Sequence, residues 1–163
     1  MKQPFILTLV SSVACAATAA NKAPENTTPT MSKTPKVVYI YADDLGYGDL
    51  VWYGAKNVQT PNVNRLAKSG ILFTNAHATA ATSTPSRYSM LTGEYAWRKE
   101  GTDVAAGNAG MIIRPEQYTM ADMFKSVGYT TAAVGKWHLG LGDQTATQDW
   151  NAPLPCALGD LGF

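Results

Sequence analysis

The sequence predicts an α/β fold with a mostly parallel sheet, because segments typical of buried strands alternate with segments typical of helices. Residues 37–42, VVYIYA, are β-branched, aromatic and almost continuously apolar, as a central strand of a parallel sheet is. Residues 71–76 and 129–135 predict two further strands. Helical segments separate these strands, and a sheet of this kind places its chemistry at the carboxyl ends of its strands.

Two of the predicted helices have clear boundary signals. Thr60 is an N-cap ahead of a proline at the first helical position, and Gly70 ends that helix. Thr119 and Asp122 have capping-box spacing at the start of another helix, which ends at Gly128. These signals predict helices over residues 60–70 and 119–128.

Composition and the amino-terminal segment indicate where the protein acts. The chain has 163 residues and a formal net charge of +1, so no nucleic-acid partner is expected. Residues 1–20 have a lysine near the start, an apolar middle and an alanine-rich end, which predicts a signal peptide and export to the periplasm or the exterior. Cleavage before Cys15 would instead give a lipoprotein and membrane contact. Residues 21–36 predict a flexible linker, so the folded part covers residues 37–163.

Two adjacent carboxylates follow the first predicted strand. Asp43 and Asp44 repel each other unless a cation lies between them. Their oxygen atoms suit a hard ion such as Ca²⁺ or Mg²⁺. The alternative is that one aspartate caps a turn while the other faces water.

Lys136 and His138 follow the third predicted strand. They are two residues apart, so in an extended chain they project to the same face and can both meet an anion. The alternative is an ordinary exposed lysine and a histidine satisfied beside Trp137. His77 has no partner at an informative spacing, and we assign it a structural role.

The segment STPSRYSMLTG, residues 83–93, predicts a helix that begins at a small nucleophile. Pro85 suits the first turn, which places Ser83 and Thr84 at or just before the N-cap. The free N–H groups and the positive end of the helix dipole favour an anion there. Arg87 lies one turn after Ser83 and can reach the same side. A plain N-cap followed by a surface arginine is the alternative.

This segment resembles the first signature of the type I (arylsulfatase-like) sulfatases. That signature reads Cys or Ser, any residue, Pro, Ser, Arg, three residues, Leu, Thr and Gly. Residues 135–140, GKWHLG, are similar to the second signature of the family. Residues 42–50 and 60–77 resemble its amino-terminal part, with Asn64 where an aspartate is usual. The fixed positions of the first signature are present as Ser83, Pro85, Ser86, Arg87, Leu91, Thr92 and Gly93.

The resemblance implies an alkaline-phosphatase-like α/β fold with helices on both faces of the sheet. It also implies hydrolysis of sulfate esters, either sulfated glycans or aryl sulfates. In the family, a maturase oxidises the first signature residue, here Ser83, to formylglycine, whose hydrate is a geminal diol. Asp43, Asp44 and the modified Ser83 match ligands of a bound Ca²⁺.

Three further residues match the catalytic residues of the family. Arg87 matches the residue that holds the diol. Lys136 and His138 match residues that bind the sulfate and the diol. Such a site explains the need for an aldehyde, because a plain serine would form a stable sulfate ester that water removes slowly.

The sequence also departs from the family pattern. Sulfatases complete the metal site with residues from a later part of the chain, and this sequence ends at Phe163. We therefore expect a truncated, inactive chain that exposes sheet edges and apolar faces. Two other classes stay open. One is a phospho- or phosphonohydrolase of the same superfamily with an unmodified nucleophile, and the other is a non-catalytic fragment.

Overall fold

The computed structural model describes residues 6–7, 34–144 and 149–163 of the chain. The predicted signal peptide apart from Ile6 and Leu7, the predicted lipidation at Cys15 and most of the predicted linker lie outside these residues. Within the described part, no helix is long and apolar enough to cross a membrane.

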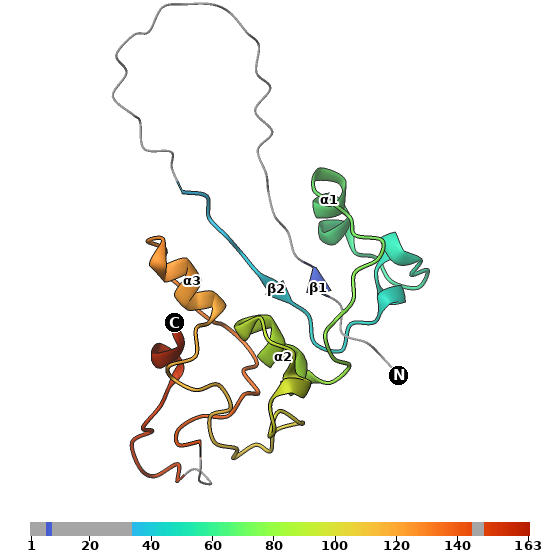
Figure 1. Cartoon of the computed structure of the whole chain (residues 1–163). Helices are drawn as coiled ribbons and strands as arrows, with labels where there is room; N and C mark the ends of the chain where they lie inside the picture. The colour runs from blue at the N-terminus through green and yellow to red at the C-terminus, as the bar shows by residue number, and fades with distance from the viewer. Residues whose placement is uncertain (1–5, 8–33, 145–148) are drawn as a thin grey trace, which may run out of the picture.

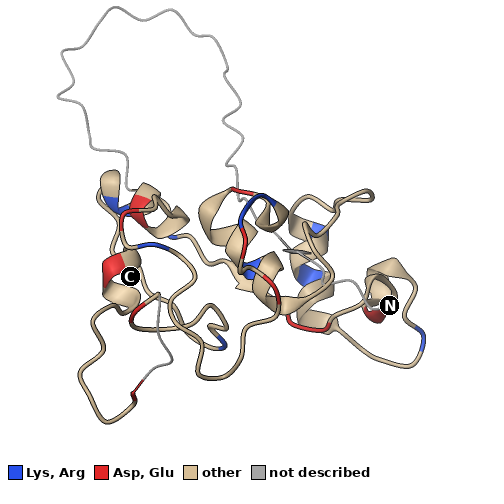
Figure 2. Cartoon of the chain, turned by 60° about the horizontal axis from the view of Figure 1, so that its bottom comes forward, with Lys and Arg blue, Asp and Glu red and all other residues tan. Residues whose placement is uncertain are grey.

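Helix α2 lies at the centre of the described part of the molecule, with α1 on one side and α3 on the other (Figure 1). It packs against the short helix η3 and against α3. Lysine and arginine residues are interspersed with aspartate and glutamate along the chain (Figure 2). The elements are, in order, β1 (Ile6–Leu7), β2 (Ile40–Tyr41), the 3₁₀ helices η1 (Tyr47–Asp49) and η2 (Val51–Tyr53), α1 (Pro61–Ser69), α2 (Ser83–Thr92), the 3₁₀ helix η3 (Ala96–Arg98), α3 (Met120–Ser126) and the 3₁₀ helix η4 (Leu158–Leu161).

The described residues do not contain the predicted parallel sheet. Their sheet has two strands, and β1 pairs with β2 in the antiparallel direction. The predicted strand 37–42 is reduced to β2, and neither 71–76 nor 129–135 forms a strand. The predicted helices on both faces of a sheet therefore have no such sheet to cover.

The physical reason is that a strand exists only through a hydrogen-bonded neighbour. The apolar side chains that suggested central strands are also not covered by other elements. Val38 is 72% exposed, Ile40 56% and Val134 100%. The exposure of apolar faces expected from the sequence is therefore confirmed. β2 pairs with a short apolar strand, which is how an open edge is satisfied when no longer neighbour is present.

The predicted ends of α1 and α3 are confirmed. Thr60 is the N-cap of α1, with a proline at the first helical position. Thr119 is the N-cap of α3, and its hydroxyl oxygen accepts a hydrogen bond from the Asp122 N–H at 3.2 Å. The Asp122 carboxylate accepts one in return from the Thr119 N–H at 2.9 Å. Local sequence signals alone define these two helices.

The helix of the first signature begins one residue earlier than expected. Thr82 is the N-cap of α2 and Ser83 is its first helical residue, whereas the sequence placed Ser83 and Thr84 at or before the cap. Pro85 still lies in the first turn, where its missing N–H leaves no hydrogen bond unmade. Ser83 therefore lies on the helix itself, one full turn before Arg87.

The hydrophobic core surrounds the carboxyl half of α2. It combines side chains of that helix with side chains from the loops on either side of α3 and from η4. Burying each large aliphatic side chain contributes about 1.5–3 kcal/mol. The core residues are Tyr88, Leu91, Ala96, Met111, Ile113, Leu139 and Leu161.

Two loops cross with their backbones in contact at Gly140. A hydrogen bond from the Ile112 N–H to the Leu139 carbonyl (2.9 Å) lies before the crossing, and one from the Leu141 N–H to the Ala109 carbonyl (3.2 Å) lies after it. Gly140 has a φ of +69°, and a Cβ atom there would lie 1.8 Å from the Gly110 carbonyl oxygen. Only glycine fits this crossing, which holds the loop that carries Lys136 and His138.

We therefore expect Gly140→Ala to destabilise the protein by more than about 2 kcal/mol, since it adds a backbone clash to an unfavourable φ. Gly101→Ala, at a φ of +76° but with open space around the new methyl group, should cost only about 1 kcal/mol. Gly107→Ala, which meets neither problem, should have almost no effect. Urea denaturation of the three variants checks the order, and equal losses at positions 140 and 101 would contradict the contact.

Candidate functional site

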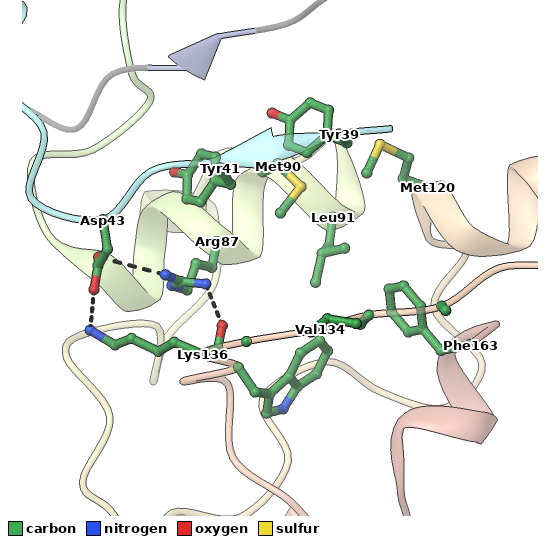
Figure 3. A pocket seen from close by; sticks show the side chains of 14 residues that line it. Tyr39, Tyr41, Asp43, Arg87, Met90, Leu91, Met120, Val134, Lys136 and Phe163 are labelled. Atoms are coloured by element: carbon green, nitrogen blue, oxygen red, sulfur yellow. Dashed lines mark hydrogen bonds and ion pairs between the residues drawn. The ribbon is translucent and has the colours of Figure 1, made fainter. Parts of the chain in front are cut away.

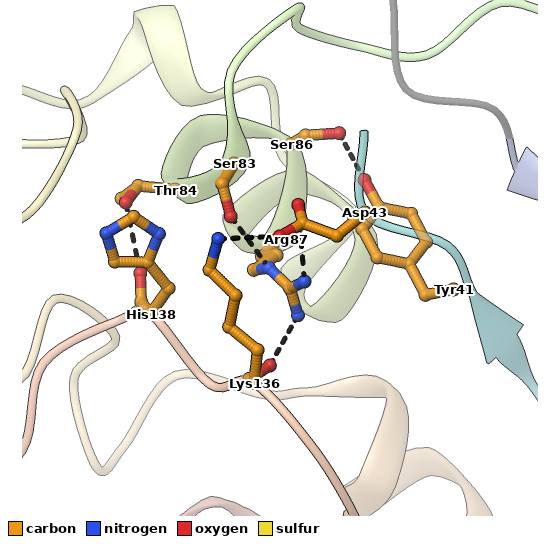
Figure 4. A network of polar contacts seen from close by, with 8 residues as sticks. All are labelled: Tyr41, Asp43, Ser83, Thr84, Ser86, Arg87, Lys136 and His138. Atoms are coloured by element: carbon orange, nitrogen blue, oxygen red, sulfur yellow. Dashed lines mark hydrogen bonds and ion pairs between the residues drawn. The ribbon is translucent and has the colours of Figure 1, made fainter. Parts of the chain in front are cut away.

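The guanidinium of Arg87 lies at the centre of a polar cluster in which three segments meet (Figure 4). Its Nε donates a hydrogen bond to Ser83 Oγ at 2.9 Å, and a terminal nitrogen donates to the Lys136 carbonyl oxygen. Its other terminal nitrogen lies 3.6 Å from Asp43 Oδ1. The group also lies over the ring of Tyr41, 5.5 Å from the centroid. With 8% of its surface exposed, Arg87 is not the surface residue of the alternative interpretation.

Asp43 is paired with two cations. Its Oδ2 accepts a hydrogen bond from Lys136 Nζ at 2.6 Å, and its Oδ1 faces Arg87. The hydrogen bond from Lys136 is the largest of the effects that hold the pKa of Asp43 below its ordinary value of 3.8, and burial of the carboxyl opposes them. The cations that relieve repulsion from Asp44 are therefore side chains of this chain.

Asp43, Asp44 and Ser83 line one hollow of about 230 Å³ at the start of α2. These three predicted metal ligands offer two carboxylates and a hydroxyl, the hard oxygen donors that Ca²⁺ prefers. Ca²⁺ takes six to eight oxygen ligands, and the described residues contain no group of three or more His, Cys, Asp or Glu side chains that could hold a metal. The donors present therefore fit part of a Ca²⁺ site.

His138 is tied to the start of α2 through its backbone. Its carbonyl oxygen accepts a hydrogen bond from Thr84 Oγ1 at 3.0 Å, and its ring Nε2 lies 3.0 Å from the Ala105 carbonyl oxygen. Lys136 and His138 both extend from their loop toward the start of α2 (Figure 4), but the backbone here is not the extended chain that the sequence predicted. His138 has a φ of +59°, which turns the chain. Lys136 reaches Asp43, and the His138 ring reaches Ala105.

Positive φ values at non-glycine residues coincide with the candidate site. In the described ranges they occur at Asp44 (58°) and His138 (59°). Such conformations cost about 1–3 kcal/mol and persist where the surroundings enforce them, most often at functional sites. His77, by contrast, is exposed and contacts the side chain of Asn75, away from this cluster.

Sequence reasoning missed Tyr41 and Thr84. Tyr41 contacts Arg87 with its ring, and its hydroxyl group hydrogen-bonds the Ser86 hydroxyl. One signal could have found it: Tyr41 precedes Asp43 by two residues, so the two side chains share a face of the strand. Thr84 occupies the variable position of the first signature, and its two long-range backbone partners leave no trace in the local sequence.

A second hollow of about 380 Å³ adjoins the cluster (Figure 3). Asp43, Arg87 and Lys136 lie at one end of it, where the dashed ion pairs and hydrogen bonds converge. The rest of its wall is largely apolar. It includes Tyr39, Met90, Leu91, Met120, Val134 and Phe163. The charged cluster therefore borders an apolar wall on one side and the carboxylate-lined hollow on the other.

Comparisons with known proteins agree with this geometry. A family model described as Sulfatase matches residues 35–159. An N-acetylgalactosamine-6-O-sulfatase of Bacteroides thetaiotaomicron is 54% identical over 132 residues, which cover 81% of this chain and 26% of the relative. Human arylsulfatase A is 40% identical over 119 residues, which cover 71% of this chain and 23% of the relative.

One solved structure is similar to this chain in both sequence and fold. It comes from work on the metabolism of glycosaminoglycans by Bacteroides thetaiotaomicron, superposes with a TM-score of 0.77 and is 53% identical. The match covers 81% of this chain and 27% of that structure. The chain thus spans about a quarter of the length of the relatives it matches.

The pairing of Lys136 with Asp43 has a measurable consequence. Because the folded state lowers the pKa of Asp43, the ionised carboxylate contributes stability fully above its unfolded value near 3.8. That contribution is lost as the pH falls through the folded value. Lys136→Met should raise the pKa of Asp43 toward 3.8 and flatten this acid loss of stability. Carboxyl-carbon NMR titration measures the pKa, with Lys125→Met, an exposed lysine of α3, as the control. An unchanged pKa in Lys136→Met would contradict the pairing.

Proposed function

Because the chain belongs to the sulfatase family, we propose that the protein containing it, at the length of its relatives, hydrolyses sulfate esters. The observation that carries the proposal is the hydrogen bond from Arg87 Nε to Ser83 Oγ, made at the amino-terminal end of α2. A small nucleophile is held there by a buried guanidinium. The resemblance to a bacterial N-acetylgalactosamine-6-O-sulfatase favours sulfated glycans over aryl sulfates as the substrate class.

We propose further that a maturase oxidises Ser83 to formylglycine. When present, the hydrate of that group supplies two hydroxyls on one carbon, so that sulfate can leave when the second hydroxyl loses its proton. Ser83 is only half-buried and lies at the beginning of α2. Its neighbour Arg87 orients the oxygen atom at this position with a fixed N–H group.

The other charges of the cluster favour a bound sulfate group. Lys136 and Arg87 share the single carboxylate of Asp43, so this ion-paired group of three carries an excess positive charge. The N–H groups of the first turn of α2, which have no partner within the helix, lie at the same end of α2 as Ser83. Both features stabilise negative charge that develops on sulfuryl oxygens. We propose that His138 accepts a hydrogen bond from a hydroxyl of the group at position 83.

For the metal, we propose that Asp43, Asp44 and the modified Ser83 hold Ca²⁺ together with ligands from the remainder of the protein. A bound Ca²⁺ would favour ionisation of a hydroxyl group at position 83.

For the fold, we propose that the remainder of a protein of that length supplies strands beside β2 and beside residues 129–135. The result would be a mostly parallel alkaline-phosphatase-like sheet with helices on both faces.

For localisation, the apolar residues 1–20 support export to the periplasm or exterior, with a lipoprotein at Cys15 as the alternative.

Production of the protein at the length of its relatives, together with a serine-type maturase, tests the function. We expect the peptide that contains Ser83 to lose two hydrogen atoms, which mass spectrometry detects, and the protein to cleave 6-O-sulfated N-acetylgalactosamine. Ser83→Ala should abolish both the modification and the cleavage. The modification should also occur on the 163-residue chain alone, without turnover. An unmodified Ser83 together with cleavage of phosphate esters would support the related hydrolase instead.

Arg87→Lys separates geometry from charge. The substitution keeps a positive charge but loses the fixed Nε–H that contacts Ser83 Oγ. We expect turnover of the sulfated substrate to fall by roughly 10²-fold or more, the usual effect of losing one preorganised donor. Arg65→Lys on the exposed face of α1 is the matched control and should leave turnover unchanged. Near-normal turnover in Arg87→Lys would contradict the proposed role of Arg87 in orienting the group at position 83.

A further inference from the structure

We infer that Thr84 is a positioning residue that fixes the orientation and the tautomer of His138. The inference concerns a residue at the variable position of the first signature. Its catalytic consequence rests on the proposed sulfatase function, whereas its structural part does not.

Thr84 joins three segments through one hydroxyl group. The residue is completely buried. Its Oγ1 donates a hydrogen bond to the His138 carbonyl oxygen and accepts one from the Ala105 N–H, each at 3.0 Å. His138 and Ala105 are far from Thr84 in the sequence, and Thr84 directly follows Ser83. The hydroxyl therefore sets where both backbone segments lie relative to the nucleophile position.

The Ala105 carbonyl in turn determines the proton on the His138 ring. His138 Nε2 lies 3.0 Å from this oxygen. A carbonyl oxygen only accepts hydrogen bonds, so Nε2 carries the proton in the contact. In the neutral ring, Nδ1 then presents a lone pair. Residue 105 thus receives the Thr84 bond on its nitrogen and fixes the His138 ring with its oxygen.

The remaining ring nitrogen, Nδ1, is a hydrogen-bond acceptor in this tautomer. His138 Nδ1 is buried and has no hydrogen-bond partner among the described residues. A buried acceptor without a partner is costly, and His138 also adopts the left-handed backbone conformation. Both costs are incurred at one residue, which points to a role for Nδ1 as a hydrogen-bond acceptor toward a group bound beside α2. The network that holds it is drawn in Figure 4.

The test uses Thr84→Val, which keeps the shape but removes the hydroxyl, and Thr84→Ser, which restores it. The control is Thr119→Val, because Thr119 is also buried and its hydroxyl also bonds a distant carbonyl, that of Leu161. Nitrogen NMR of the 163-residue chain reports the ring tautomers. The chain has two histidines, so His77→Gln identifies the His138 signals.

We expect a single tautomer protonated at Nε2 in the wild type, in Thr84→Ser and in Thr119→Val, and a mixture in Thr84→Val. In the protein at the length of its relatives, Thr84→Val should lower kcat by roughly 10- to 100-fold, as loss of a group that orients a functional histidine does. KM should change by less than about twofold, because the substrate contacts remain. Thr84→Ser should recover most of kcat, and Thr119→Val should lower stability alone.

A single Nε2-protonated tautomer in Thr84→Val, or an equal loss of kcat in Thr119→Val, would overturn the inference. A wild-type protein without activity on sulfate esters would overturn the proposed function. The ring tautomers of the four proteins would still decide whether Thr84 positions His138.

Discussion

The buried guanidinium of Arg87 is the interaction on which the candidate site depends. A charged group removed from water costs several kcal/mol unless it is paired and hydrogen-bonded. Arg87 meets this requirement with Ser83 on its own helix, Asp43 after β2 and the carbonyl of Lys136 on a distant loop. Burial of the charge is therefore linked to the assembly of all three segments, and the same contacts set the position of Ser83.

The helices of this chain are readable from sequence because their signals are local. The capping box of Thr119 and Asp122 contains both partners within one turn. The strands are not readable in the same way. Val38 and Val134 have the composition of central strands, yet a strand needs a hydrogen-bonded neighbour that no local pattern supplies. The chain spans about a quarter of the length of the relatives it matches, so the neighbours that the proposed sheet requires cannot be read from its own sequence.

The residues of the candidate site likewise differ in how far their contacts can be predicted from local sequence. Ser83 and Arg87 are one helical turn apart, so their contact follows from spacing, and Asp43 and Lys136 were found because they end predicted strands. Thr84 could not be assigned a contact, because its hydroxyl bonds residues 21 and 54 positions away. The orientation of the His138 ring was unpredictable for a related reason. It depends on a left-handed backbone angle, which residues other than glycine adopt uncommonly and which no local pattern here indicates.

Under the proposed function, the left-handed backbone at Asp44 and His138 sets stability against activity at these two positions. Glycine adopts these φ values without strain, so replacing either residue by glycine would relieve the folded state of an unfavourable conformation. It would also remove a carboxylate from one hollow and a ring acceptor from the cluster. A population of variants selected for thermal stability alone would drift toward glycine at positions 44 and 138, and selection for the proposed sulfatase activity would oppose that drift.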